Sequence, residues 1–231
     1  MFMDRDDVSL YFKQVSLFAD LADEDIRQLM AAAKKRTFRP GEVIFHRDDV
    51  GQVLYVIKEG KVNICLISPE GQEISLVVLG KGDCFGELAI LDRLPRSADA
   101  IAIDRVECYT LQRSDFHNAI MKSPKIAIQV LEVLSRRLRK TDDKVEDLVV
   151  LDVYARVAKK LLELATEHGV QVENGTRIDM RLTQQDIASM VGASRESVNK
   201  VMGYFTDKRY ISTDKHKITL HRMDELRQRI Y

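Results

Sequence analysis

The hydrophobic pattern of this 231-residue chain begins as that of a helix and changes near residue 37. From Val8 to Lys35 apolar residues recur at helical spacing, and Asp23 is placed to cap a helix that contains Ile26 and Leu29. Short β-prone runs bounded by turn residues follow, and they predict strands at Glu42–His46, Gln52–Lys58, Lys61–Ile67, Glu73–Leu79, Ala98–Ile103 and Glu107–Gln112. Short strands at such close spacing indicate an antiparallel sandwich or barrel rather than a parallel sheet.

One long helix is predicted from Pro124 to Val150, with Pro124 in its first turn. Along one face of this helix, which we call the seam, the spacing alternates between three and four residues. The seam positions are Leu131, Leu134, Leu138, Thr141, Val145 and Leu148. This is the heptad pattern of a coiled coil. The helix could instead pack on its own barrel, but its length and its place between two different regions favour a coiled coil between two copies. Thr141 is polar, and a polar residue buried in such a seam lowers stability unless its hydroxyl has a hydrogen-bond partner.

Beyond residue 150 the pattern predicts a helix at Asp152–His168, a turn at Gly169, a hairpin at Asn174-Gly175 and a compact helical region. The strongest structural signal is Leu182–Tyr210, which fits a helix-turn-helix.

Residue types at fixed positions carry this prediction. Thr183 can cap a helix over Gln184–Val191, Gly192 can supply the left-handed conformation that ends it, and Ser194 can cap a second helix over Arg195–Thr206. An ordinary helical hairpin is the alternative.

The second helix of this motif carries polar residues suited to DNA. Arg195, Glu196, Asn199 and Lys200 lie outside its apolar stripe and near its N-terminus, where recognition helices contact base edges. The Arg195 guanidinium could donate two hydrogen bonds to one guanine, and the Glu196 carboxylate could accept one from cytosine. Lys200 suits a contact with guanine or with a phosphate. The alternative for Glu196 and Lys200 is a surface ion pair, which can coexist with DNA contacts in the free protein.

Phosphate contacts are expected elsewhere on the same motif. Ser197 and Thr183 are the candidates, because hydroxyl contacts to phosphates position a protein without reading sequence. The closing hairpin Tyr210–His221 carries Lys215, His216 and Lys217 at its tip. This tip could touch neighbouring phosphates as a wing, or it could be an ordinary solvated turn.

A second chemical motif is FGELAILDRLPRSA at Phe85–Ala98. Gly86 can open a short helix whose exposed N–H groups favour an anion. The Arg96 fork is a natural partner for a phosphate, and the Ser97 hydroxyl adds a donor. Glu87 fits such a site if it bonds hydroxyls, which a ribose supplies. The set therefore describes a nucleotide monophosphate site, although an Arg–Glu pair alone is more often structural.

Composition narrows the possible functions. The chain has 36 basic and 36 acidic residues, and residues 151–231 hold 14 of the former and 11 of the latter, which permits nucleic-acid binding there. Cys65, Cys84 and Cys108 form no CxxC pair, so we expect no disulfide scaffold, zinc site or iron–sulfur cluster. No apolar run reaches the ~18 residues of a membrane span and no signal peptide is visible, so we expect a cytoplasmic protein. Nothing in the residue pattern indicates catalysis.

These motifs resemble the family of the cAMP receptor protein and the fumarate–nitrate regulator (CRP/FNR), which are bacterial transcription factors. The resemblance covers nearly the whole chain and is carried by Phe85–Ala98, Arg136–Leu162 and Leu182–Met202. It implies an α+β fold in three parts: an N-terminal antiparallel β jelly-roll domain that binds a cyclic nucleotide (1–123), a dimerisation helix (124–150) and a C-terminal winged helix-turn-helix domain (151–231).

The resemblance also implies a ligand and the residues that hold it. The ribose and cyclic phosphate of cAMP, an allosteric effector, would lie against Gly86, Glu87, Leu88, Ala89, Arg96 and Ser97. Thr141 would reach the adenine amino group, which explains a polar seam residue. Asp142 stands where the cAMP receptor protein has a small hydroxyl residue. The alternative is therefore the same fold with another effector, such as cGMP or cyclic di-GMP, or with no ligand at all.

The expected partners are double-stranded DNA, a second copy of the chain and RNA polymerase, without a membrane, metal, haem or iron–sulfur cluster. Arg195, Glu196 and Lys200 match the base-reading positions of the family, with Lys200 where Arg is usual. The expected half-site resembles TGTGA in an inverted repeat.

Overall fold

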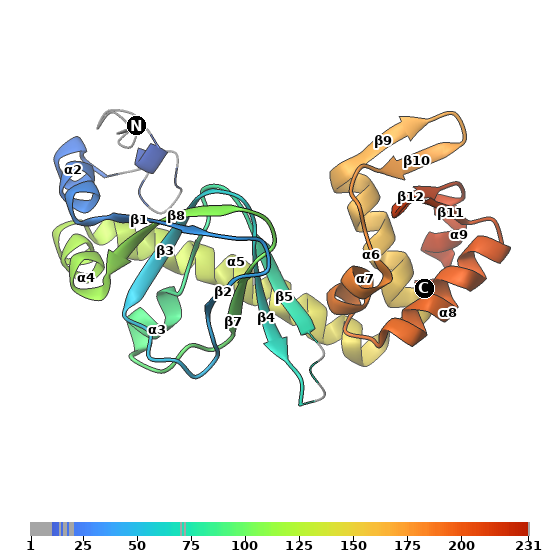
Figure 1. Ribbon diagram of the computed structural model, residues 1–231, viewed down its shortest axis with the longest axis horizontal. Helices are drawn as coiled ribbons and strands as arrows, with labels where there is room; N and C mark the ends of the chain where they lie inside the picture. The colour runs from blue at the N-terminus through green and yellow to red at the C-terminus, as the bar shows by residue number, and fades with distance from the viewer. Residues whose placement is uncertain are drawn as a thin grey trace. The chain divides into compact units, whose positions relative to one another are not determined.

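The structure is a computed structural model that describes residues 11–13, 15, 18, 21–69, 71 and 73–230. The chain divides into two compact units, residues 1–67 with 75–139 and residues 68–74 with 140–231. Figure 1 shows the strands and helices of both units. Each unit has its own buried hydrophobic residues. No helix in the described part of the chain is both long enough and apolar enough to cross a membrane.

The first unit is built on two four-stranded sheets, in the orders β1-β8-β3-β6 and β2-β7-β4-β5. The strands are β1 (Lys34–Phe38), β2 (Val43–Phe45), β3 (Val53–Glu59), β4 (Val62–Ile67), β5 (Glu73–Leu79), β6 (Cys84–Phe85), β7 (Asp99–Ala102) and β8 (Val106–Gln112). The β1–β8, β3–β8, β3–β6, β2–β7 and β4–β7 pairs are antiparallel, which confirms the predicted antiparallel architecture.

Strand β3 shows how the core is divided. Tyr55 and Ile57 face the interior between the two sheets, whereas Leu54 and Val56 face a layer of helices, because successive side chains of a strand point to opposite faces. The helices are α2 (Asp23–Ala32), α4 (Arg113–Lys122) and the start of α5 (Pro124–Val150). The short helix α3 (Glu87–Asp92) follows β6.

The N-terminal helix differs from its prediction. It was expected to run to Lys35, but α2 ends at Ala32, and Lys34 already pairs with Thr110 of β8. Strand β1 reads KKRTF and lacks an apolar alternation, so only its pairing with β8 makes it a strand. Ala22, not Asp23, is the N-cap, and residues 8–10, 14, 16, 17, 19 and 20 of the expected helical segment lie outside the described residues.

Helix α5 spans the predicted residues, Pro124–Val150. Ile126 and Val130 are buried in the core of the first unit, so the start of the helix packs on its own barrel. Of the six seam positions, Leu131, Leu138, Val145 and Leu148 have exposed fractions of 63, 61, 54 and 52%. The helix therefore has two apolar faces, one covered within the chain and one exposed.

The second unit confirms the predicted element order. It contains α6 (Val153–His168), β9 (Gly169–Val172), β10 (Gly175–Ile178), α7 (Gln184–Val191), α8 (Arg195–Asp207), β11 (Ile211–Asp214), β12 (Lys217–Leu220) and α9 (Met223–Gln228). Gly169, predicted as a turn, is the first residue of β9. The four strands form one sheet in the order β11-β12-β10-β9, and its apolar side packs with α6, α7 and α8 in a single core.

Candidate functional site

The Phe85–Ala98 motif forms a tight turn in front of helix α3. Gly86 is the N-cap of α3 and has a left-handed backbone with φ of 81°, a region that favours glycine. A Cβ atom at Gly86 would lie 2.5 Å from Arg96 Nη1 and 3.0 Å from the carbonyl oxygen of Val53. Both the backbone conformation and the close approach of Arg96 therefore require a glycine here.

Arg96 fills the centre of this site and is only 5% exposed. Its Nη1 donates to the carbonyl oxygen of Gly86 at 2.7 Å and its Nη2 to that of Val53 at 2.8 Å. Its guanidinium carbon lies 4.2 Å from the centroid of the Phe45 ring, within the range of a cation–π contact. The Nε–H is buried and has no acceptor among the described residues. Burial lowers the pKa of Arg96, and an anion beside the guanidinium would offset that desolvation.

The loop before β3 holds Arg96 in place. Arg96 N donates to Asp49 O, and Asp48 N donates to Arg96 O, each at 2.9 Å. Gly51 follows in the same loop, and a Cβ atom there would lie 2.5 Å from Ala89 Cβ and 2.8 Å from Arg96 Cζ. Sequence reasoning did not single out Gly51, because its role comes from this tertiary contact and not from a local motif.

Glu87 is 5% exposed and meets a cation that the sequence analysis also missed. Its Oε1 lies 2.6 Å from Nη1 of Arg137, which comes from α5. The other terminal nitrogen of Arg137 donates to the carbonyl oxygen of Cys84. Arg137 thus joins α5 to both ends of the Cys84–Glu87 turn. Its position in a run of charged residues gave no signal that distinguished it from Arg136.

The other residues expected at this site lie in two places. Ala89 is buried against Gly51, Leu88 is 40% exposed on α3, and Ser97 is exposed directly after Arg96. Thr141 and Asp142 are both exposed on the part of α5 that belongs to the second compact unit.

The helix-turn-helix has the predicted caps. The Thr183 side chain accepts from Asp186 N, and the Asp186 carboxylate accepts from Thr183 N, which forms a capping box. Gly192 is left-handed with φ of 62° at the end of α7, and the Ser194 side chain accepts from Ser197 N at the start of α8. Helix α8 buries Val198, Val201, Met202 and Phe205.

The predicted DNA-contacting residues gather on the outer face of this motif. Arg195, Glu196, Asn199 and Lys200 are all exposed, and Ser197 is half-buried. Among the described residues no ion pair joins Glu196 to Lys200, so the surface-pair alternative is not observed. Gln184 of α7 donates to Asn199 Oδ1 at 2.8 Å across the two helices.

The wing follows the prediction in part. Lys215 and His216 form the exposed turn between β11 and β12, with φ of 46° and 66°. Lys217 instead lies 3.1 Å from Asp179 in an ion pair. Lys215 and His216 are therefore the more accessible members of the predicted basic tip.

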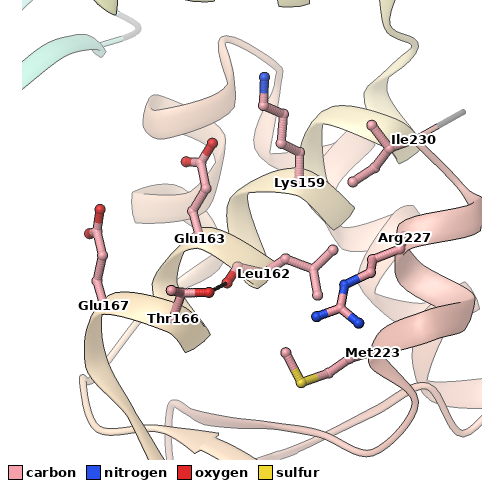
Figure 2. Close-up of a pocket in the computed structure, with 8 residues that line it drawn as sticks. All are labelled: Lys159, Leu162, Glu163, Thr166, Glu167, Met223, Arg227 and Ile230. Atoms are coloured by element: carbon pink, nitrogen blue, oxygen red, sulfur yellow. Dashed lines mark hydrogen bonds between the residues drawn. The ribbon is translucent and has the colours of Figure 1, made fainter.

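The cysteines and the remaining cavity add no further chemistry. All three cysteines are buried, and burial raises the pKa of Cys84 and of Cys108 to about 12. No three His, Cys, Asp or Glu side chains of the described ranges are grouped so that they could hold a metal ion. A groove of about 340 Å³ lies between α6 and α9 (Figure 2). Its lining combines the apolar side chains of Leu162, Met223 and Ile230 with the polar ones of Lys159, Glu163, Thr166, Glu167 and Arg227.

Comparisons with known proteins match both units. Residues 35–123 match the family model of the cyclic nucleotide-binding domain, and residues 155–229 match that of the Crp-like helix-turn-helix domain. A CRP-like cAMP-activated global transcriptional regulator of Mycobacterium tuberculosis is 36% identical over 94% of this chain and 96% of its own length.

Two more comparisons agree with this match. The cyclic AMP receptor protein of Thermus thermophilus is 33% identical over 80% of this chain and 83% of its own length. The structure of a c-di-GMP-responsive global regulator from Xanthomonas campestris shares the fold, with a TM-score of 0.78 and 23% identity over 87% of this chain and 99% of that chain.

Proposed function

Because this chain belongs to the CRP/FNR family of cyclic-nucleotide-responsive transcription regulators, we propose that it is a homodimer that binds DNA in response to cAMP. Its relatives are transcription regulators and not enzymes. The mycobacterial relative is cAMP-activated by name, which favours cAMP over other cyclic nucleotides. We place the protein in the cytoplasm, with the DNA that it binds.

The observation that carries the nucleotide site is the buried guanidinium of Arg96, whose Nε–H has no acceptor in the part of the chain that the structure describes. An anionic phosphate supplies the acceptors and the negative charge that such a group favours. Arg96 and Ser97 are the proposed phosphate ligands. Glu87 uses Oε1 for Arg137, and the proposal assigns its other oxygen to a ribose hydroxyl. Gly86, Leu88 and Ala89 complete the contact with the sugar and phosphate.

The exposed seam of α5 supports the proposed dimer. Four apolar seam side chains are more than half exposed, and a second α5 helix would cover them as a coiled coil does. Thr141 is the proposed contact of the adenine amino group. Asp142 beside it favours a second candidate function, in which another cyclic nucleotide is the effector or DNA binding needs no ligand.

In this proposal cAMP shifts a population that already contains the DNA-binding arrangement. The effector must bind that arrangement better than the other, and a coupling of about 1–3 kcal/mol is a usual size for such a preference. The two recognition helices of the dimer would then stand about 34–36 Å apart, one turn of DNA. RNA polymerase is the proposed partner of the DNA-bound dimer.

DNA reading is assigned to the exposed start of α8. We propose that Arg195, Glu196 and Lys200 read a TGTGA-like half-site, while Ser197 and Thr183 contact phosphates. Arg195→Ala should relax the preference at one guanine by about 1–3 kcal/mol in free energy of binding. Binding to operators substituted at each position measures this, and unchanged discrimination at every position would contradict the assigned role.

The test of the whole proposal is a titration onto a duplex with the TGTGA inverted repeat at fixed salt, without nucleotide and with cAMP, cGMP or cyclic di-GMP. Fixed salt is needed because phosphate contacts make the affinity depend steeply on salt. We expect cAMP alone to tighten binding, Arg96→Ala to abolish that response, and Arg47→Ala, which removes an exposed arginine on the neighbouring loop, to keep it. A response of Arg96→Ala to micromolar cAMP would reject the site. Equal sequence-specific binding in all conditions would support the second candidate.

A further inference from the structure

The outer face of the helix-turn-helix carries a pair of amide side chains that link its two helices. Gln184 stands in the first turn of α7 and Asn199 in the second turn of α8, and Gln184 Nε2 donates to Asn199 Oδ1 at 2.8 Å. Asn199 is exposed and Gln184 is half-buried. We call Gln184 and Asn199 the amide clamp.

The clamp limits what Asn199 can offer to DNA. An asparagine reads adenine with both ends of its amide, since Oδ1 accepts from the base and Nδ2 donates to it. Here Oδ1 is turned towards Gln184, so the end available outside the clamp is Nδ2 with its two N–H donors. Gln184 Nε2 has a second N–H as well. Beside the Gln184 Oε1 acceptor, the clamp therefore offers N–H donors from both of its amides, which suit an acceptor such as a phosphate oxygen.

The place of the clamp in the motif agrees with this donor character. In helix-turn-helix proteins the first helix crosses the DNA backbone while the second enters the major groove. Gln184 lies at the N-terminal end of the first helix, where the helix dipole favours an anion and the Asp186 carboxylate is engaged in the capping box. Glu196 and Arg195 lie at the start of α8, one turn before Asn199. The clamp thus stands at the side of the recognition surface where the backbone runs.

From this geometry we infer that the amide clamp binds one DNA phosphate through Asn199 Nδ2 and Gln184 Nε2, and that it sets the register of α8 without reading a base. This inference rests on the proposed DNA-binding function. Asn199 is the contact, and Gln184 is also a positioning residue because it fixes the orientation of the Asn199 amide. Both groups are neutral, so their contact adds affinity without adding a positive charge.

The neutral character gives a sharp test. Binding of the full-length protein is measured at several salt concentrations to the TGTGA operator and to operators substituted at each half-site position, with and without cAMP. Asn199→Ala and Gln184→Ala should each weaken binding about tenfold or more on every sequence, since each removes a hydrogen bond that a neutral side chain donates to a charged phosphate. The salt slope should stay unchanged. Lys200→Ala, which removes a cation, should instead lower the slope by about one if Lys200 contacts a phosphate.

Two further variants complete the design. Asn199→Asp keeps the acceptor for Gln184 but places a carboxylate against the phosphate, so it should bind DNA more weakly than Asn199→Ala while the domain stays folded. Gln228→Ala removes an exposed amide on α9 and should bind as the wild type does.

Three results would overturn the inference: a loss confined to one base position, which makes Asn199 a base reader; wild-type affinity in both alanine variants, which makes the clamp a purely internal contact; or Asn199→Asp equal to Asn199→Ala. If the wild type itself does not distinguish the operator from a scrambled duplex, the proposed function fails instead. The two failures are therefore separate.

Discussion

The ion pair between Arg137 and Glu87 should be a main source of stability for the nucleotide-binding unit. The Glu87 side chain is 6% exposed and that of Arg137 is 24% exposed, and the two charged atoms lie 2.6 Å apart. Arg137→Met would leave Glu87 as a buried carboxylate without its ion-pair partner and would also remove a donor from the carbonyl oxygen of Cys84. Breaking one side of a buried pair costs about 3–5 kcal/mol.

The free-energy cost of Arg137→Met predicts a shift of the urea midpoint of unfolding. Arg137 is partly exposed, so we take the lower end, about 3 kcal/mol. With a urea dependence of about 1.5 kcal/mol per M for a unit of this size, the unfolding midpoint should fall by about 2 M. Arg136→Met is the matched control, because Arg136 is 60% exposed and meets Glu132 only at 3.8 Å. An exposed pair contributes about 0–1 kcal/mol, so its midpoint should move by less than about 0.7 M.

Cys84 provides an assay at the site itself. Its thiol is buried and its pKa is raised to about 12 by that burial, so it should not react with thiol reagents at pH 8 until the turn opens. The labelled fraction of Cys84, measured by mass spectrometry at increasing urea concentrations, gives the unfolding midpoint of this unit. The double variant Glu87→Gln with Arg137→Met should recover part of the loss, because it removes both charges. Equal midpoints for Arg137→Met and Arg136→Met would show that the Glu87–Arg137 pair does not stabilise this unit.

Three more predictions follow from single contacts. Gly203→Ala should raise the stability of the C-terminal unit by about 0.5–1 kcal/mol in thermal unfolding, because alanine favours helix and no described residue outside the adjoining helix backbone lies within 4 Å of the added Cβ. Gly51→Ala should weaken cAMP binding in calorimetry, since its Cβ would lie 2.8 Å from the Arg96 guanidinium carbon. The hydrogen bond from Lys35 lowers the pKa of Glu107 below its ordinary 4.5, so this pair stabilises above pH 4.5 and its contribution is lost as the pH falls further. Lys35→Met should flatten that dependence in urea titrations between pH 5 and 3, and an unchanged profile would exclude the pair as its cause.

Local chemistry explains which elements the sequence predicts well. The Thr183, Gly192 and Ser194 caps act on their own helix ends, so a window of a few residues contains the information, and the structure confirms them. Strand β1 was missed because the hydrogen bonds of its exposed KKRT run come from β8, far along the chain. Strand β6 is only two residues long, Cys84 and Phe85, and is likewise defined by its partner β3.

The same distinction applies to the nucleotide site. The Phe85–Ala98 motif predicted from residue types and spacing that Arg96 binds a phosphate. It did not predict Gly51 and Arg137, which reach the motif from a loop before β3 and from α5. Their side chains act through space, and single positions in the sequence show no sign of that. The site therefore consists of the local Phe85–Ala98 motif and of two residues, Gly51 and Arg137, that contact it in the folded chain. Only the local motif can be predicted from the sequence.

Thr183 and Ser197 show why residue type alone does not assign a phosphate contact. Both hydroxyls stand at helix starts, and the types that cap helices are also those that bind phosphates. The Thr183 hydroxyl donates to Asp186 Oδ2 at 2.7 Å while it accepts from Asp186 N, so its proton is already used within the capping box. The Ser197 hydroxyl accepts from that of Ser194 at 2.9 Å, which leaves its own proton for another acceptor. A hydroxyl needs a proton to donate, so Ser197 is the stronger of the two proposed phosphate contacts. Thr183 acts first as a cap, and its hydroxyl donates to a phosphate only when it releases Asp186.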